Sequence, residues 1–164
     1  MNMTHYMELL ATNQPWNLII YMAIPVILAE TIAITELVLL FTRNFGGTVR
    51  RINRYAGIMA GIYFVPIFLT LMKNAVIPLT LTGGWRGPAD VIAVLSYLAG
   101  VFPLGGIALL ELDVIGRGLD DTGKMKLHAT FVGIFLVVAH VAMIFGMLSP
   151  ELFSPSVAPH DMAM

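Results

Sequence analysis

The chain has 164 residues, of which 58% are hydrophobic and 12% are charged, whereas soluble domains contain about 45–50% apolar and about 25% charged residues. Nine basic and ten acidic side chains are too few to cover a soluble globule, and the mean hydropathy of +0.85 indicates a surface that faces lipid. A net charge of −1 and the lack of cysteine argue against nucleic-acid binding, disulfides and thiolate metal sites.

Four apolar segments are each long enough to cross a bilayer, which takes about 20 helical residues. They run over residues 16–41, 56–81, 89–115 and 127–148. The connections between them are short and rich in Gly, Arg, Asp and Lys, so successive helices should be antiparallel neighbours. The sequence therefore predicts an all-α polytopic membrane protein, a four-helix antiparallel bundle that forms one domain over residues 1–164.

The basic residues predict the orientation of this bundle. Seven of the nine lie in the first and third connections or beside them, namely Arg43, Arg50, Arg51, Arg54, Arg117, Lys124 and Lys126. Positive charge near the ends of membrane helices favours the cytoplasmic side. We therefore expect both connections in the cytoplasm and both termini outside it, as in an integral protein of a bacterial inner membrane.

Prolines interrupt three of the predicted helices. They are Pro25, Pro66 and Pro103. Proline lacks a backbone N–H, so each one leaves a carbonyl about one turn earlier without its helical partner. The affected carbonyls lie near Tyr21, Ile62 and Ala99, and they need other donors because lipid supplies none. In the second helix, Gly57 and Gly61 predict close packing against a neighbour.

Two ionisable residues lie near the middle of the predicted spans, Glu30 in the first helix and His140 in the fourth. A charged side chain at this depth costs at least about 2.5 kcal/mol on insertion scales, so such residues are rare and often functional. We expect Glu30 to be neutral or paired with His140. Lys73 could join them or extend toward the interface.

A second polar layer is predicted nearer the cytoplasmic side. Its members are Glu36, Glu111, Asp113 and His128. Carboxylates and an imidazole from neighbouring helices can bind a divalent transition metal. The nearby arginines offer a simpler alternative, because ion pairs with these acids would need no metal.

Sulfur ligands suggest a third kind of site. His140, Met143 and Met147 follow one another at a spacing of three and four residues, which places them on one face of a helix. Thioethers and imidazole suit Cu(I), so this face could handle copper. Methionine also packs well in ordinary apolar surroundings.

Haem b is the remaining cofactor that the pattern allows. A transmembrane four-helix bundle with two histidines on one helix, His128 and His140, resembles the membrane b-type cytochromes in architecture. That resemblance implies axial histidines from two helices, whereas the first three predicted helices contain none. A haem here would need one of the two histidines together with a methionine such as Met22.

Three functions remain open from the sequence. The first is a permease-like protein that moves a proton or a transition metal, with Glu30, Glu36, Glu111, His128 and His140 as its polar sites. The second is a haem- or metal-binding subunit in electron transfer, and the third is a non-catalytic membrane anchor or assembly subunit. No hydrolase or nucleotide-binding motif occurs, which favours a role other than catalysis. Four helices are few for a transporter, so we expect a homo-oligomer or a subunit of a larger membrane complex.

Overall fold

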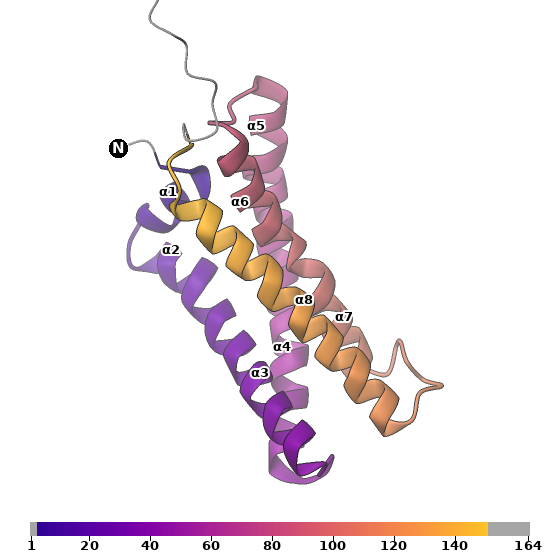
Figure 1. The fold of residues 1–164 in the computed structure, drawn as a ribbon. Coiled ribbons are helices and arrows are strands. Elements are labelled where there is room, and N and C mark those ends of the chain that lie inside the picture. The colour runs from indigo at the N-terminus through magenta and orange to yellow at the C-terminus, as the bar shows by residue number, and fades with distance from the viewer. Residues whose placement is uncertain (1–2, 151–164) are drawn as a thin grey trace, which may run out of the picture.

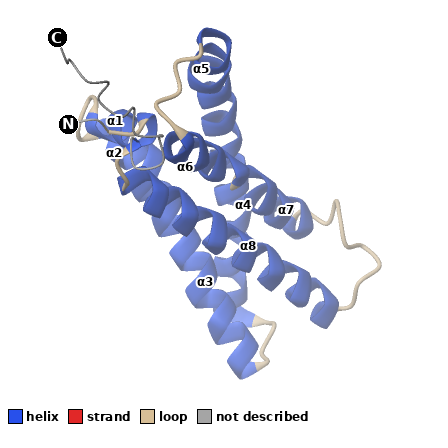
Figure 2. Ribbon diagram, turned by 45° about the horizontal axis from the view of Figure 1, so that its top comes forward, coloured by secondary structure: helices blue, strands red, loops and turns tan. Residues whose placement is uncertain are grey.

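A computed structural model describes residues 3–150, and every regular element in this range is helical (Figures 1 and 2). The helices, in chain order, are α1 (His5–Ala11), α2 (Trp16–Leu18), the π-helix η1 (Ile19–Ala23), α3 (Ile24–Thr42), α4 (Gly47–Leu71), the π-helix η2 (Met72–Val76), α5 (Ile77–Thr82), α6 (Pro88–Ala99), α7 (Val101–Glu111) and α8 (Asp121–Met147). Residues 1–2 and 151–164 lie outside the described part of the chain.

Several of these elements join end to end into four helices that are long and apolar enough to cross a membrane. They cover Trp16–Thr42, Gly47–Thr82, Pro88–Glu111 and Asp121–Met147. The prediction of an all-helical membrane protein with four spans is therefore confirmed. Residues 3–11 form a short segment that covers one end of the bundle, which we call the α1 end (Figure 1). The loops 43–46 and 112–120 lie at the opposite end, which we call the arginine-rich end.

The helix boundaries differ from the predicted ones at the arginine-rich end. The second span begins at Gly47 rather than at residue 56, so the arginines of the first connection are mostly helical. The fourth begins at Asp121, because the Asp120 side chain caps it by accepting the N–H of Gly123 at 2.9 Å. The third ends at Glu111 rather than at residue 115. Hydropathy marks the apolar stretch alone, whereas helices continue into polar surroundings wherever a cap permits.

Prolines disturb the spans as expected. Pro25 stands at the start of α3, directly after the π-helix η1. The third span is divided at Gly100 into α6 and α7, three residues before Pro103. Pro66, by contrast, lies inside α4, which continues past it.

The α4 helix packs against α3 on one side and α7 on the other, while α8 packs on α6 and α7. Gly57 and Gly61 permit the close contact between α4 and α7, as predicted. A Cβ atom on Gly57 would come within 2.7 Å of the Ile107 side chain, and one on Gly61 would meet Ala108. Phe64, Leu104 and other apolar side chains fill the core between these helices.

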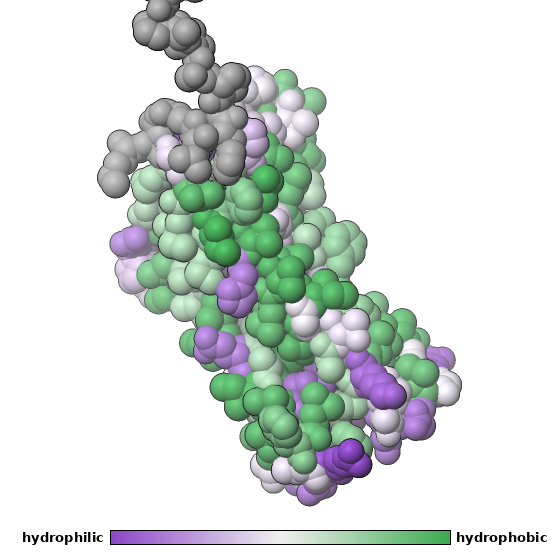
Figure 3. Space-filling model, viewed as in Figure 1, coloured by the Kyte–Doolittle hydropathy of each residue, from purple (hydrophilic) through white to green (hydrophobic). Residues whose placement is uncertain are grey.

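The face of the bundle seen in Figure 3 is mostly apolar. Phe41, Leu81 and Phe102 are at least 75% exposed, and many smaller aliphatic side chains join them. A surface of this kind implies contact with the lipid bilayer.

Candidate functional site

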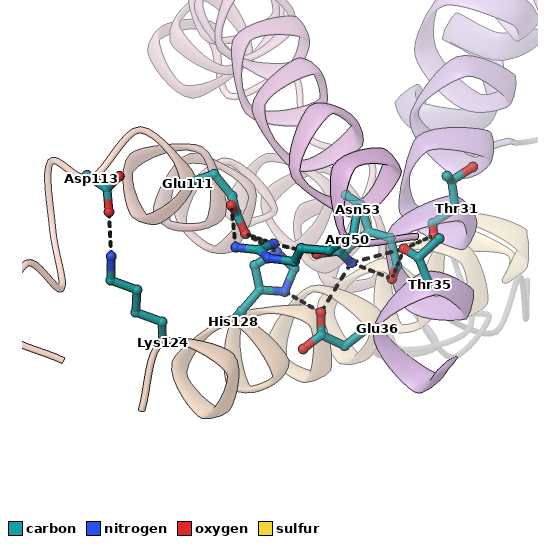
Figure 4. A network of polar contacts seen from close by, with 10 residues as sticks. Thr31, Thr35, Glu36, Arg50, Asn53, Glu111, Asp113, Lys124 and His128 are labelled. Atoms are coloured by element: carbon teal, nitrogen blue, oxygen red, sulfur yellow. Dashed lines mark hydrogen bonds and ion pairs between the residues drawn. The ribbon is translucent and has the colours of Figure 1, made fainter. Parts of the chain in front are cut away.

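Five polar side chains from four helices meet near the arginine-rich end (Figure 4). They are Glu36 of α3, Arg50 and Asn53 of α4, Glu111 of α7 and His128 of α8, and we call them the polar cluster. All except Arg50 are at most 4% exposed. Buried polar groups must satisfy one another, because the surrounding apolar residues cannot.

The imidazole of His128 lies between two carboxylates. Its Nδ1 atom is 2.7 Å from Oε2 of Glu36, and its Nε2 atom is 3.4 Å from Oε1 of Glu111. Neither ring nitrogen has a hydrogen-bond partner in the described range, so these are close contacts between ring nitrogens and carboxylate oxygens without aligned hydrogen bonds. The ring therefore faces negative charge on both sides.

Glu111 is held by a two-point contact with Arg50. The guanidinium donates from Nη1 to Oε1 at 2.7 Å and from Nη2 to Oε2 at 2.8 Å. Nη1 also lies 3.1 Å from Oδ1 of Asn53, which accepts a further hydrogen bond. Paired hydrogen bonds between guanidinium and carboxylate are strong and fix orientation. Arg50 thus compensates Glu111 and sets its position.

Glu36 is less completely satisfied. Its Oε2 atom accepts a hydrogen bond from Nδ2 of Asn53 at 3.2 Å. Its Oε1 atom is buried and has no hydrogen-bond partner among residues 3–150. A buried carboxylate oxygen without a donor costs about 1–3 kcal/mol, so Oε1 of Glu36 is the least satisfied carboxylate oxygen of the cluster.

Asn53 fixes the geometry between α3 and α4. It is completely buried, and besides Glu36 its Nδ2 reaches the carbonyl oxygen of Ile32 at 3.3 Å and Oγ1 of Thr35 at 2.9 Å. A misplaced amide here would leave several buried groups unpaired. Asn53 therefore holds Glu36 at the position where it meets His128.

The formal charges of the cluster do not cancel without one more positive charge. Glu36 and Glu111 carry two negative charges and Arg50 carries one positive charge. Buried charge is strongly disfavoured unless it is paired. With both carboxylates ionised and His128 neutral, one added proton would bring the formal charge of the cluster to zero.

A cavity of about 150 Å³ connects the cluster to the arginine-rich end. Arg50, Glu111 and His128 line it together with Arg54, Asp113 and Lys124, among others. At its edge, Nζ of Lys124 donates to Oδ1 of Asp113 at 2.5 Å. This hydrogen bond lowers the pKa of Asp113 below its usual 3.8, and the positive charge of Lys124 acts in the same direction.

The structure thus brings together three of the predicted site residues, Glu36, Glu111 and His128. The other predicted site residues lie on the surface of the chain, namely Met22, Glu30, His140, Met143 and Met147. Lys73 is exposed as well.

Glu30 and His140 are not joined by a hydrogen bond or ion pair in the described range. Six residues separate Glu30 from Glu36, which corresponds to about 120° around the helix, so Glu30 points away from the cluster. His140 lies about 18 Å along α8 from His128, and Glu30 lies about 9 Å along α3 from Glu36. The two side chains are therefore at different depths. His140 instead has its Nδ1 atom 2.6 Å from the Leu136 carbonyl oxygen of its own helix.

Arg50 and Asn53 were missed as site residues because their segment was predicted to be a connection. Both precede Gly57 and Gly61 at helical spacing, three and four residues apart. This regular spacing was the available signal that α4 begins earlier and carries both side chains on its buried side, where Arg50 reaches α7 and Asn53 reaches α3.

The arrangement bears on the predicted metal and haem sites. In the described range, no three His, Asp or Glu side chains are grouped so that they could hold a metal ion. Both ring nitrogens of His128 face carboxylates, which leaves neither directed at a haem iron. His140 and Met22, the other predicted haem ligands, are exposed.

Comparison with known proteins identifies the family of the chain. Residues 1–162 match the sequence profile described as a family of unknown function, DUF6803, and the chain belongs to this family. Neither the curated proteins nor the solved structures gave a match.

Proposed function

We propose that this protein is a permease-like membrane protein whose polar cluster takes up and releases one proton from the arginine-rich end. The observation that carries the proposal is the position of His128 between two buried carboxylates, one of which has an oxygen without a donor. Such a site changes its charge by one when a proton enters or leaves. Ionisable groups inside membrane spans mark proton and ion pathways.

The surroundings of the cluster favour a proton over a metal cation. Arg50, Arg54 and Lys124 line the cavity that leads to it, and their positive charge repels a metal ion that approaches from this end. A proton needs no such approach as a separate ion, because side chains and water can pass it on.

The basic residues also favour one side of the membrane. The arginine-rich end carries most of the positive charge of the chain, and such ends face the cytoplasm. We therefore propose that the cluster exchanges its proton with the cytoplasm of a bacterial cell. Both termini would then lie outside the cytoplasm.

A second subunit fits the surface of the bundle. The α3 helix packs mainly against α4 and has only sparse contact with α8, and its Glu30 is exposed within the span. An ionisable side chain that faces lipid at this depth is costly. A second copy or a partner subunit that covers this part of α3 would remove that cost.

Proton flux into proteoliposomes tests the proposal. The purified protein is reconstituted with a pH-sensitive dye inside the vesicles, and a potassium gradient with valinomycin drives proton movement. We expect Glu36→Gln and His128→Gln to reduce the flux at least tenfold relative to the wild type. Glu30→Gln is the matched control, because it removes a carboxylate from the same helix outside the cluster.

Thermal melting of each variant in detergent separates loss of function from loss of fold. If folded Glu36→Gln and His128→Gln proteins carried the same flux as the wild type, the cluster would have no part in proton movement.

A structural role is the second candidate, and Asn53 favours it. The three contacts of its Nδ2 with α3 and the paired contact between Arg50 and Glu111 tie α3, α4 and α7 together, as expected of an anchor or assembly subunit. In that case the variants would alter melting or complex formation, and the wild type itself would carry no proton flux.

A further inference from the structure

A second carboxylate–histidine pair lies at the α1 end of the bundle, far from the polar cluster. Asp90, near the start of α6, is completely buried. Its Oδ1 atom accepts the backbone N–H of His5 at 2.6 Å, and its Oδ2 atom lies 2.5 Å from Nδ1 of the same residue. The backbone N–H of Arg86 also donates to Oδ2, at 3.2 Å. Asp90 therefore fixes both the backbone and the ring of His5.

Of the two ring nitrogens of His5, Nε2 is the one left available to a ligand. Nδ1 is engaged by Asp90, and Nε2 has no hydrogen-bond partner in the described range. His5 lines a cavity of about 390 Å³ that lies between α1, α6 and the far end of the second span. A buried carboxylate that fixes the orientation of a histidine at a cavity wall gives a preorganised hydrogen-bonding position.

Much of the remaining wall of this cavity is apolar and aromatic. Its two uncharged polar side chains, Thr12 and Asn17, donate to the carbonyl oxygens of Glu8 and Leu9. Leu9, Leu71 and Val94 supply aliphatic surface. The rings of Tyr6 and Tyr97 lie 5.1 Å apart and tilted by 40°, and both residues line the cavity. Burial raises the pKa of Tyr6 to about 12, so its phenol is neutral and adds no charge. The cavity therefore suits an apolar ring.

The charged residues at the edge neutralise each other. Arg86 forms an ion pair with Glu8, and it donates to the carbonyl oxygen of Met3 at 2.6 Å. With these groups paired, the edge does not favour an anion or a cation. The ligand that fits is uncharged, with one polar atom that reaches His5.

The second span supplies one wall of the cavity. Leu71 and Ala75 line it, and both belong to the helix Gly47–Thr82, which is long and apolar enough to cross a membrane. A compound dissolved in lipid is therefore concentrated next to this wall. The site favours a lipid-soluble compound over a water-soluble one.

We propose that this cavity binds a lipid-soluble quinone, whose ring lies against Tyr6 and Tyr97 and whose oxygen bonds Nε2 of His5. A protonated imidazole donates to a quinone carbonyl, and a neutral one accepts from a quinol hydroxyl. The quinone carbonyl and the quinol hydroxyl occupy the same ring position, so one oriented histidine can bind either the oxidised or the reduced form. The proposal concerns binding and is independent of proton exchange at the polar cluster.

Tryptophan fluorescence offers a direct test. The chain has two tryptophans, so a Trp16→Phe protein retains Trp85 alone, whose ring lies edge-on to His5 with centroids 6.4 Å apart. Decylubiquinone is titrated into this protein in lipid nanodiscs. We expect saturable quenching of Trp85. We expect His5→Leu to weaken the apparent affinity at least tenfold and His5→Gln, whose amide can still donate, to weaken it less.

Two further variants and a competitor complete the test. Ala75→Phe fills the cavity and should abolish saturable quenching, whereas His140→Leu changes an exposed histidine elsewhere and should leave it intact. Thermal melting confirms that each variant is folded. Quenching that rises without saturation would overturn the proposal. So would saturable binding that is insensitive to both His5 substitutions or equally displaced by decanol, since either would indicate a non-selective apolar cavity.

Discussion

The hydroxyl of Tyr97 donates to the carbonyl oxygen of Tyr21 at 2.6 Å, and this carbonyl is the one that Pro25 leaves without a helical donor. A second tyrosine serves the preceding carbonyl, that of Ile20. In the π-helix η1 the N–H of Ile24 bonds to the carbonyl oxygen of Ile19 instead of that of Ile20. Tyr63 donates to the Ile20 carbonyl oxygen at 3.0 Å. The disturbed turn of the first span is thus satisfied by α4 and α6.

This relationship predicts that Tyr97→Phe destabilises the protein. The substitution keeps the buried ring and removes only the donor, so the Tyr21 carbonyl loses its partner at a cost of about 1–3 kcal/mol. Chemical unfolding in detergent micelles measures the change in the free energy of unfolding. Tyr55→Phe is the control, because this tyrosine is exposed and should change stability by less than about 0.5 kcal/mol. Equal effects of both substitutions would contradict the assigned hydrogen bond.

Removal of the arginine from the polar cluster should be costly. Arg50→Gln leaves Glu111 buried without its two-point partner, and breaking a buried ion pair in this way costs about 3–5 kcal/mol. The same unfolding measurement applies, and Arg51→Gln, at an exposed position of the same helix, should change stability by about 0.5 kcal/mol or less. Arg50→Lys keeps the charge but loses the paired geometry, so we expect it to fall between the two. An Arg50→Gln protein with the same free energy of unfolding as the wild type would show that the Arg50–Glu111 pair does not contribute to stability.

Close packing between α4 and α7 gives a third prediction. In Gly61→Ala the new methyl group would meet Ala108 and approach the Leu104 carbonyl oxygen to 2.7 Å. Overpacking of this kind costs about 1–3 kcal/mol. Gly133→Ala is the matched control, because nothing lies within 4 Å of its added Cβ and alanine favours the helix. Comparable melting temperatures for the two variants would contradict the close contact.

The pair at the edge of the cluster cavity predicts a pH dependence. The pKa of Asp113 is lowered in the folded protein, so its contribution to stability is present above the unfolded pKa and is lost as the pH falls through the folded value. Asp113→Asn removes the contribution while tolerating the left-handed backbone at this position, where φ is 55°. We expect the wild type to melt slightly above the variant at pH 6. The difference should vanish below the lowered pKa, and a difference that grew on acidification would contradict this assignment.

The sequence predicted the spans well because their signal is local. Composition and hydropathy identify apolar stretches of sufficient length, and proline chemistry alone indicated that the Tyr21 carbonyl would need another donor. The pairing of Glu36, Glu111 and His128 at a similar depth also followed from counting residues along antiparallel helices.

Rotation about each helix axis was harder to predict. Glu30 and His140 were expected to meet near the middle of the spans, yet both are exposed, because side-chain direction depends on which helices are neighbours. Arg50 and Asn53 were not predicted as site residues for a related reason, because hydropathy cannot show that a polar segment continues a helix. Tertiary contacts, rather than composition, decide both questions.

The depth of the polar cluster also determines how strongly the membrane voltage acts on it. Glu36 lies six residues from the end of α3 at Thr42, or about 9 Å along the helix axis, in a hydrocarbon layer about 30 Å thick. In the proposed exchange, a proton that passes between the cluster and the arginine-rich end would cross at most about a third of the layer. Since a full crossing at 100 mV corresponds to about 2.3 kcal/mol per charge, this step would involve about 0.7 kcal/mol, and the larger part of the voltage would act on the path between the cluster and the α1 end.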